Sequence, residues 1–236
     1  MKFSIVIACY NEEKSLETLI ERILPLTLKY NIEFILVENG STDNSRDVFK
    51  SLEAIDHKSI EVIYVDKNRG YGYGLLQGLK SASGNYVGWI HADMQIAPKE
   101  LCKFLSYAEK FGNDTRFFLK GKRENRSLVD RLFTAGQSIF NSILFMVPLY
   151  DVGAIPVIFE RTLLHGIDIA PYDFSIELFF YNKAIKNRFV IKRERVTLID
   201  RENGASSWNK GIKSKFMQSR VIFVDSIKIR LGIPVR

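Results

Sequence analysis

The segment Trp89-Ile90-His91-Ala92-Asp93-Met94-Gln95 gives the strongest single indication of how this chain folds. The apolar run at residues 86–90 predicts a short buried strand that ends just before a group of polar residues. In open α/β sheets, ligands bind in the crevice outside the carboxyl ends of the strands. His91, Asp93 and Gln95 alternate, so an extended backbone would point all three side chains to one side. A helix cap or turn is the alternative interpretation for Asp93.

Strand and helix patterns alternate with short gaps through the first half of the chain. β-rich runs predict strands at residues 2–9, 32–37, 60–65 and 86–90. Apolar residues three and four positions apart predict a helix between each pair of runs, and Pro98 suits the first turn of a further helix. Repeated alternation of this kind predicts an α/β fold with a mostly parallel, Rossmann-like sheet flanked by helices on both faces.

The second half of the chain loses this regular alternation. Its patterns predict strands at residues 117–119, 152–159 and 189–198 and helices at residues 128–145 and 174–185. No internal repeat or low-complexity linker separates the two halves. We therefore expect residues 1–208 to form one compact domain.

The tail at residues 209–236 carries a different pattern. Over residues 212–231, apolar side chains recur at helical spacing and alternate with lysine and arginine. A basic amphipathic helix of this kind can lie on an anionic membrane surface. It can equally pack on the body of the protein with its charges solvated, and the pattern leaves both interpretations open.

Composition limits the class of protein further. At 236 residues, with 46% hydrophobic and 26% charged residues, the chain is typical of a globular domain. It opens with no signal-peptide pattern and has no run near the roughly 20 apolar residues of a membrane span, so we expect a cytoplasmic location. Cys9 and Cys102 lie in apolar patterns and are predicted to be buried free thiols. The net charge of +7 indicates an anionic partner, although the basic residues lack the aromatic interleaving of a nucleic-acid groove.

Three polar loops are expected at the carboxyl edge of the sheet. They are Ala8-Cys9-Tyr10-Asn11-Glu12, Glu38-Asn39-Gly40-Ser41-Thr42-Asp43 and the segment that contains Asp93 and Gln95. Carboxylates and amides in the first two loops suit the base or ribose of a nucleotide. Asp93 and Gln95 suit a hard cation that neutralises a diphosphate. A zinc site is disfavoured because no Cys/His cluster has zinc-ligand spacing.

The glycine-rich stretch Asn68-Arg69-Gly70-Tyr71-Gly72-Tyr73-Gly74 is a weak signal by itself. It follows the third predicted strand, whereas the dinucleotide-binding fingerprint follows the first. A Rossmann dehydrogenase is therefore disfavoured. We expect this stretch to turn tightly or to let the backbone approach a ligand.

Taken in order, these motifs resemble those of the family 2 glycosyltransferases with the A-type fold, especially the branch of dolichyl-phosphate mannose synthase. Residues 8–12 resemble the family's P-x-Y-N-E-like turn, residues 38–43 its D-D-G-S-x-D loop, and residues 91–95 its D-A-D-x-Q metal motif. Four further matches are weaker. A glycine motif is matched by Asn68, Gly70, Gly72, Gly74 and Gly78, and a G-S-R strand end by Gly121-Lys122-Arg123. An R…S…N helix is matched by Arg131, Ser138 and Asn141, and an R-x-x-G-x-S loop by residues 201–207. The matches span residues 5 to 208.

The chain departs from the family pattern at the predicted nucleotide and metal sites. His91 stands where the first aspartate of the metal motif is usual. Glu38 and Asn39 replace the paired aspartates of the second loop, and Gly74 stands where alanine is usual. His91 would remove a charge close to the nucleotide or cation, Glu38 keeps a carboxylate, and Asn39 would alter contacts to the base or ribose.

The resemblance implies that a sugar is moved from a UDP- or GDP-sugar with inversion at the anomeric carbon. It implies a nucleotide-sugar half at about residues 1–115 and an acceptor half at about 116–208. Asp93 and Gln95 would hold Mg²⁺ or Mn²⁺, and Asp43 is better explained as a helix cap. The implied nucleotide contacts are Ala8, Tyr10, Glu12, Glu38, Asn39, Gly70, His91 and Ala92.

The acceptor is the main open question. A polyprenyl phosphate is already an anionic nucleophile and needs cations, for which Arg123, Arg131 and Arg201 are suited. A sugar hydroxyl of a lipid-linked glycan or polysaccharide needs a general base, and Asp173 or Glu177 is the candidate unless these are ordinary helix-start residues. The arginines and the basic tail favour a lipid-phosphate acceptor and a protein peripheral on the cytoplasmic face of the membrane.

Two further classes were weighed against an active glycosyltransferase. A non-catalytic sugar-nucleotide binding protein is an alternative that the replacement at His91 motivates. A nucleotidyltransferase is disfavoured, because Tyr10-Asn11-Glu12-Glu13-Lys14 does not resemble a glycine-rich phosphate loop.

Overall fold

The structure is a computed structural model that describes residues 1–53, 58–93, 95–111, 115–124, 127–199 and 212–235. Within these ranges, seven strands form one sheet in the order β3-β2-β1-β4-β6-β5-β7. β6 runs antiparallel to both neighbours, and the other pairs are parallel. The mostly parallel sheet is therefore confirmed. The strands are β1 (Phe3–Cys9), β2 (Ile32–Asn39), β3 (Ile60–Val65), β4 (Tyr86–His91), β5 (Phe117–Glu124), β6 (Val157–Glu160) and β7 (Val190–Thr197).

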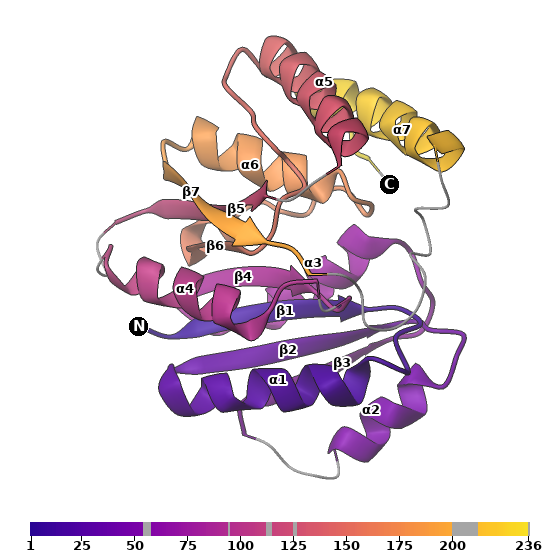
Figure 1. Cartoon of the computed structure of the whole chain (residues 1–236), viewed down its shortest axis with the longest axis vertical. Coiled ribbons are helices and arrows are strands. Elements are labelled where there is room, and N and C mark those ends of the chain that lie inside the picture. The colour runs from indigo at the N-terminus through magenta and orange to yellow at the C-terminus, as the bar shows by residue number, and fades with distance from the viewer. Residues whose placement is uncertain (54–57, 94, 112–114, 125–126, 200–211, 236) are drawn as a thin grey trace.

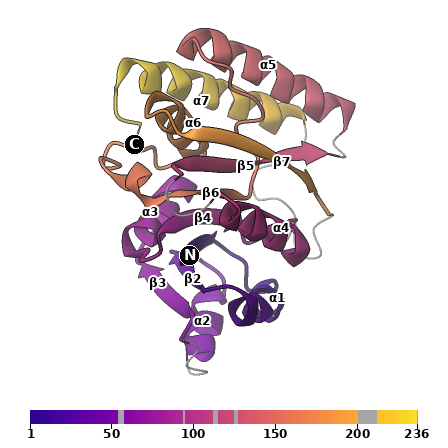
Figure 2. The ribbon, with the colours of Figure 1, turned by 90° about the vertical axis from the view of Figure 1, so that its left-hand side faces the viewer.

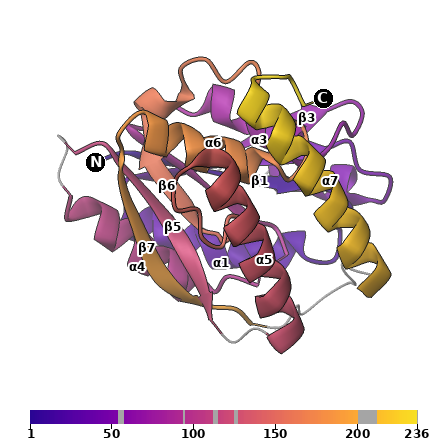
Figure 3. The ribbon, with the colours of Figure 1, turned by 90° about the horizontal axis from the view of Figure 1, so that it is seen from above.

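The central strands are buried because helices cover both faces of the sheet, which is why they appear in the sequence as continuous apolar runs. Every residue of β2 except Glu33 is buried. Figures 2 and 3 show α1 and α4 on one face and α3 and α6 on the other. The helices are α1 (Leu16–Lys29), α2 (Ser45–Glu53), α3 (Tyr71–Ser81), α4 (Pro98–Glu109), α5 (Leu128–Phe145), α6 (Ile176–Lys186) and α7 (Ile212–Leu231), with a short 3₁₀ helix at Arg161–Leu164.

Helices α5 and α7 form a separate layer beyond the β5 and β7 end of the sheet (Figure 1). They pack on each other through Phe140 and Phe223, whose ring centroids are 3.9 Å apart. Arg230 Nε also donates a hydrogen bond to the Leu144 carbonyl oxygen at 3.0 Å. The predicted helix over residues 212–231 is confirmed.

Several apolar side chains of α7 are exposed. Val221, Val224, Ile227 and Leu231 are between 36% and 67% exposed, whereas Asp225 and Ser226 are buried. Ile229, by contrast, is partly buried and packs against the hydrophobic core. The docked side of α7 thus carries polar residues together with Ile229, and the other part of its apolar pattern is exposed. None of the helices in the described part of the chain is both long enough and apolar enough to span a membrane.

Local boundaries differ from the predictions where distant contacts set them. The strand expected at residues 152–159 begins only at Val157, because residues before it form a turn around Asp151, which has a positive φ of 46°. Gly121 N donates to the Pro156 carbonyl oxygen at 2.9 Å and fixes the end of that turn. Cys9 is a buried free thiol as predicted, but Cys102 is only partly buried.

Candidate active site

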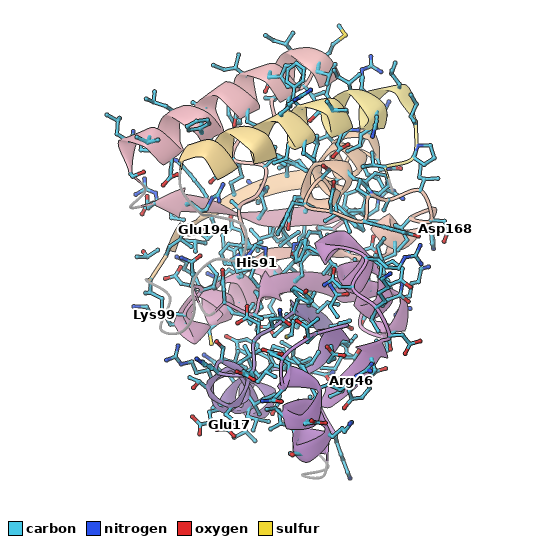
Figure 4. All side chains as sticks on the ribbon, turned by 90° about the vertical axis from the view of Figure 1, so that its right-hand side faces the viewer. Glu17, Arg46, His91, Lys99, Asp168 and Glu194 are labelled. Carbon is cyan, nitrogen blue, oxygen red and sulfur yellow. The ribbon has the colours of Figure 1, made fainter. Side chains whose placement is uncertain are left out.

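The three predicted loops leave the same edge of the sheet. Ala8 pairs with His91 across β1 and β4, and Cys9 pairs with Glu38 across β1 and β2. Because these strands are parallel, their carboxyl ends meet, as the position of the polar loops predicted. Figure 4 looks onto this edge, with His91 near the centre between the half that holds Arg46 and the layer of α5 and α7.

Hydrogen bonds join the first two loops into one wall. Asn11 Oδ1 accepts from Thr42 N at 2.8 Å, and Asn11 N donates to Ser41 Oγ at 3.1 Å. Glu12 N donates to Ser45 Oγ at 2.9 Å. Tyr10 is exposed beside this seam. The wall is therefore rigidly connected, with one aromatic side chain accessible.

Asp43 behaves as a helix-start residue. Its Oδ1 accepts from Ser45 N at 2.9 Å, at the first residue of α2, and its Oδ2 accepts from Glu13 N at 3.3 Å. A carboxylate in this position satisfies backbone amides that have no partner within the helix. The geometry agrees with the cap interpretation.

Glu38 and Asn39 are buried and hold neighbouring loops. Glu38 Oε1 accepts from Ser41 N at 2.6 Å, and its Oε2 lies 3.1 Å from Arg46 Nε. Asn39 Nδ2 donates to the Gly70 carbonyl oxygen at 3.1 Å. These contacts use both side chains to shape the wall behind the first two loops.

The start of α3 approaches the chain very closely at a glycine. Gly70 has a φ of 112°, and a Cβ there would lie 2.2 Å from the Tyr172 carbonyl oxygen. Only glycine adopts this conformation without strain. The glycine-rich stretch therefore turns tightly against residues 171–173, in agreement with one of the two roles expected for it.

The predicted extended backbone after β4 is wrong. β4 ends at His91, and Ala92 and Asp93 lie in a turn. Asp93 Oδ1 accepts from Gln95 N at 3.2 Å, so the carboxylate bends the chain back on itself. Ala92 is buried, and Asp93 and Gln95 are partly buried. A local Asx turn replaces the alternating arrangement.

This turn retains the donor types that a hard cation needs. The described residues contain no cluster of three or more His, Cys, Asp or Glu side chains that would form a complete metal site. Mg²⁺ is usually held by one or two carboxylates, with substrate phosphates and water completing the coordination. Asp93 and Gln95, one carboxylate and one amide on the same turn, fit this kind of shared site.

Glu177 lies in the first turn of α6, against Trp89 of β4 and Tyr71 of α3. It is 4% exposed, and its Oε1 accepts from Trp89 Nε1 at 2.8 Å and from Tyr71 Oη at 3.4 Å. Burial raises the pKa of Glu177 to about 7. The ring of Tyr71 also stacks edge-on against His91, with centroids 5.2 Å apart. Tyr71 thus links His91 to the buried carboxyl.

Arg123 is the second-last residue of β5, at the same edge of the sheet. Asp151 Oδ1 accepts from Arg123 Nε at 2.9 Å, and Asp151 Oδ2 accepts from Arg123 N at 3.0 Å. The Arg123 guanidinium keeps the pKa of Asp151 low, although burial alone would raise it. Arg131 is exposed on the first turn of α5. Arg201 lies outside the described residues.

Asp173 is a helix-start residue. Its Oδ1 accepts from Ser175 N at 2.8 Å just before α6. It also hydrogen-bonds the carboxyl of Asp225 on α7, and this contact together with burial raises the pKa of Asp225. Asp173 therefore ties α6 to the C-terminal helix.

Sequence reasoning missed Lys120 and Asp151. Lys120 is 1% exposed, and its Nζ donates to the carbonyl oxygens of Asp151 and Val152 at 2.6 and 2.8 Å. A lysine directly after the apolar residues 117–119 was a usable signal, because buried lysines are rare unless paired. Nothing in the local sequence marks Asp151.

Comparison with known proteins identifies the family. The sequence pattern of "Glycosyl transferase family 2" matches residues 4–145, more than half of the chain. An undecaprenyl-phosphate 4-deoxy-4-formamido-L-arabinose transferase from Proteus mirabilis is 34% identical over 111 residues, which cover 46% of this chain and 34% of that protein. A dolichol-phosphate mannosyltransferase from Pyrococcus furiosus is 28% identical over 184 residues, 75% of this chain and 51% of that protein.

Among solved structures, glucosyl-3-phosphoglycerate synthase from Mycobacterium tuberculosis, in complex with Mn²⁺, UDP and glucosyl-3-phosphoglycerate, has a similar fold. The TM-score is 0.72 at 18% identity, covering 99% of this chain and 81% of that one. At this identity the likeness concerns the fold, and it confirms the A-type glycosyltransferase fold. The chain belongs to glycosyl transferase family 2. Both relatives support a similarity to the polyprenyl-phosphate branch of the family. The chain spans only about a third to a half of the length of these two proteins.

Proposed function

We propose that this protein is an inverting glycosyltransferase that moves a sugar from a UDP- or GDP-sugar to a polyprenyl phosphate at a membrane surface. The observation that carries this proposal is the link of two arginines to the exposed apolar layer of α5 and α7: Arg131 lies on α5, and Arg123 is bonded to Asp151, whose N donates to Ser138 Oγ of α5. A lipid phosphate has both an anionic head and an apolar chain, and this region offers partners for both.

The donor would bind at the edge formed by β1, β2 and β4. The wall formed by the first two loops is bordered by Ala8, Tyr10, Glu12 and Gly70. His91 lies near the centre of this edge of the sheet (Figure 4). Glu38 and Asn39 support the wall from behind, so their contribution to nucleotide binding is through loop position.

Asp93 and Gln95 would hold Mg²⁺ or Mn²⁺ together with the diphosphate of the donor. When bound, the cation stabilises negative charge on the departing nucleoside diphosphate. The Mn²⁺-containing glucosyl-3-phosphoglycerate synthase structure supports a divalent ion in this fold. The side chain of Asp93 would be fixed for this role by its bond to Gln95 N.

A phosphate acceptor needs orientation but no general base. The pKa of Glu177 would by itself suit a base. However, its carboxyl is buried and accepts from Trp89 and Tyr71, and Asp173 accepts from Ser175 N in the turn before α6. These contacts favour a phosphate oxygen as the nucleophile over a sugar hydroxyl. A single displacement by that oxygen, without a protein nucleophile, would invert the anomeric carbon.

The acceptor half has further features that support a bound phosphate. Arg123 is presented by Asp151, and Ser138 Oγ of α5 accepts from Asp151 N at 3.1 Å. Asn141, one helical turn beyond Ser138 on α5, is fully buried, and neither polar atom of its amide has a hydrogen-bond partner among the described residues. Buried polar groups normally have partners. A polar acceptor or its water shell would supply them.

The apolar layer supports binding to a membrane surface. Between the two helices lies a cavity of about 470 Å³, lined mainly by apolar side chains such as Leu132, Phe140 and Phe223. Figure 3 shows the two helices side by side on the outside of the molecule. With a net charge of +7, the protein is suited to an anionic inner-leaflet surface. The exposed apolar residues are Leu128, Val129, Leu132, Ile139, Ile143, Met146, Val221, Phe223, Val224, Ile227 and Leu231.

A transfer assay tests the proposal. Radiolabelled UDP- and GDP-sugars are each incubated with Mn²⁺ and with either undecaprenyl phosphate or a lipid-linked sugar in detergent. Label that enters undecaprenyl phosphate, with inverted configuration, supports the proposal and names the donor. Label that enters only the lipid-linked sugar would replace it with transfer to a hydroxyl. Nucleotide binding without any turnover would indicate a non-catalytic binding protein.

A further inference from the structure

Lys120 is a buried charged residue whose contacts lead directly to Arg123. Its ammonium donates to two consecutive backbone carbonyls, those of Asp151 and Val152. It also lies 4.7 Å from the centre of the Tyr181 ring, on α6. Placing an ammonium group in the interior is unfavourable unless it is well paired. Its position directly after three buried apolar residues of β5, Phe117, Phe118 and Leu119, therefore indicates a specific role.

The segment that Lys120 holds is the one that orients Arg123. Asp151 has a left-handed backbone, with φ of 46°, which asparagine and aspartate tolerate better than most residues. Its carboxylate accepts hydrogen bonds from both the backbone N and the guanidinium of Arg123. Ser138 on α5 accepts the amide of the same residue. The turn at Asp151 is thus held by hydrogen bonds that Lys120 of β5 donates to it and by one that Ser138 of α5 accepts from it.

We propose that Lys120 is a positioning residue, which holds the Asp151 turn so that Asp151 presents the Arg123 guanidinium to the phosphate of the acceptor. This inference rests on the proposed function for the identity of the acceptor. The positioning itself is a property of the chain alone. Lys120 acts through Asp151 and does not touch the acceptor.

The surrounding charges explain why a lysine is stable here. Burial lowers the pKa of Lys120 to about 7, while the carboxylates of Glu177 and Asp151 oppose that change. Glu177 is therefore a counter-charge to Lys120, in addition to accepting from Trp89 and Tyr71. Because Tyr71 also contacts His91, the network extends from the donor edge to Arg123.

A measurement of Arg123 itself tests the positioning without any assay of transfer. In ¹⁵N-labelled protein, the Nε–H signal of Arg123 is assigned by its loss in Arg123→Lys. We expect slow exchange of this proton with water in the wild type and at least about tenfold faster exchange in Lys120→Met, since hydrogen bonds to a charged group are lost. Lys192→Met, an exposed lysine on the neighbouring strand, is the matched control and leaves the signal unchanged.

If Lys120→Met does not fold, Lys120→Leu, which also has no donor for the two carbonyls, is measured in its place. Asp151→Asn keeps tolerance of a positive φ but removes the charged partner of Arg123, so it should accelerate exchange as well. Unchanged exchange of the Arg123 proton in the folded Lys120 variant would overturn the proposal.

Kinetics with farnesyl phosphate and the donor named by the transfer assay then separate positioning from general damage. We expect Lys120→Met and Asp151→Asn each to raise the KM for farnesyl phosphate by about tenfold, with the KM for the donor unchanged. The double variant should be no worse than the worse single variant, because both residues act through one chain of contacts. The inference would be contradicted if the increase in KM in the double variant were the product of the two single increases. A fall in kcat with KM unchanged would also contradict it. If the wild type transfers to no polyprenyl phosphate, the proposed function fails, and the exchange measurement still decides the role of Lys120.

Discussion

Gly74 shows at the scale of one residue why the donor wall departs from the family pattern. A Cβ at Gly74 would lie 2.6 Å from Asn39 Cγ, a side chain that is itself buried and bonded to Gly70. The replacement of the family's usual alanine by glycine is thus matched to the space that Asn39 occupies. The residue that fits at position 74 therefore depends on the residue at position 39.

We predict that Gly74→Ala lowers the free energy of unfolding by about 1–3 kcal/mol, because the added methyl overpacks a buried contact. Gly136→Ala is the matched control, since a Cβ at Gly136 meets nothing within 4 Å on an exposed helix. That change should stabilise α5 by about 1 kcal/mol. Urea unfolding measures both, and equal effects of the two substitutions would contradict this account.

Glu177 gives a second prediction at the residue scale. If its carboxyl serves as a buried acceptor and counter-charge, Glu177→Gln should keep more than about a tenth of kcat with undecaprenyl phosphate, because loss of a general base costs about 10²–10⁴-fold. The glutamine oxygen can still accept from Trp89. Single-turnover rates at saturating donor provide the measurement. A hundredfold or larger loss would return Glu177 to the role of base.

At the scale of elements, Glu33 fastens β2 to its neighbours at the edge opposite the candidate site. Its Oε1 accepts from Ser4 Oγ at 2.6 Å and from Ser83 N at 2.8 Å, and Lys2 Nζ lies 2.9 Å from its Oε2. Partial burial alone would raise the pKa of Glu33, but these hydrogen bonds outweigh it and lower the pKa to about 2. The carboxylate form therefore stabilises the sheet.

A depressed folded-state pKa gives stability that is present above the unfolded pKa and is lost as pH falls through the folded value. Glu33→Gln should accordingly be less stable than the wild type at neutral pH. The difference should persist down to about pH 4.5 and shrink as the pH approaches 2. Urea unfolding midpoints of the wild type and Glu33→Gln, measured across this pH range, test the prediction. A difference in stability that does not change with pH would show that the pKa of Glu33 is not lowered.

Elements also show what the sequence could predict. β1, β2 and β4 are continuous apolar runs buried on both faces, so their pattern and their polar carboxyl-end loops were sufficient to predict the parallel sheet and the candidate edge. A turn at Asp93 was among the interpretations that the sequence allowed, and the hydrogen bond that forms it is local. The late start of β6 and the contact of Asp151 with Arg123 were not predictable. They depend on hydrogen bonds between residues far apart in the chain, which no local periodicity records.

At the scale of the whole molecule, the layer of α5 and α7 predicts a peripheral membrane surface. Ile143 on α5 is 73% exposed within this layer, whereas Leu28 on α1 is 91% exposed far from it in sequence and in the fold. Ile143→Glu should weaken binding to vesicles of phosphatidylglycerol and phosphatidylcholine by about tenfold, because an apolar side chain that would enter the bilayer is replaced by a charge. Leu28→Glu should have no effect. Co-sedimentation measures both, and equal binding by all three proteins would exclude this face.

We propose metal-dependent transfer of a sugar to a lipid phosphate at the edge that carries Asp93. The most direct test compares the wild type with Asp93→Asn in transfer to undecaprenyl phosphate, each with Mn²⁺ and with EDTA, using the donor named by the panel. The account predicts transfer by the wild type that EDTA abolishes, and a loss of about a hundredfold or more in Asp93→Asn, because the charge that holds the cation is removed. Full transfer by Asp93→Asn, or transfer that EDTA leaves intact, would contradict it.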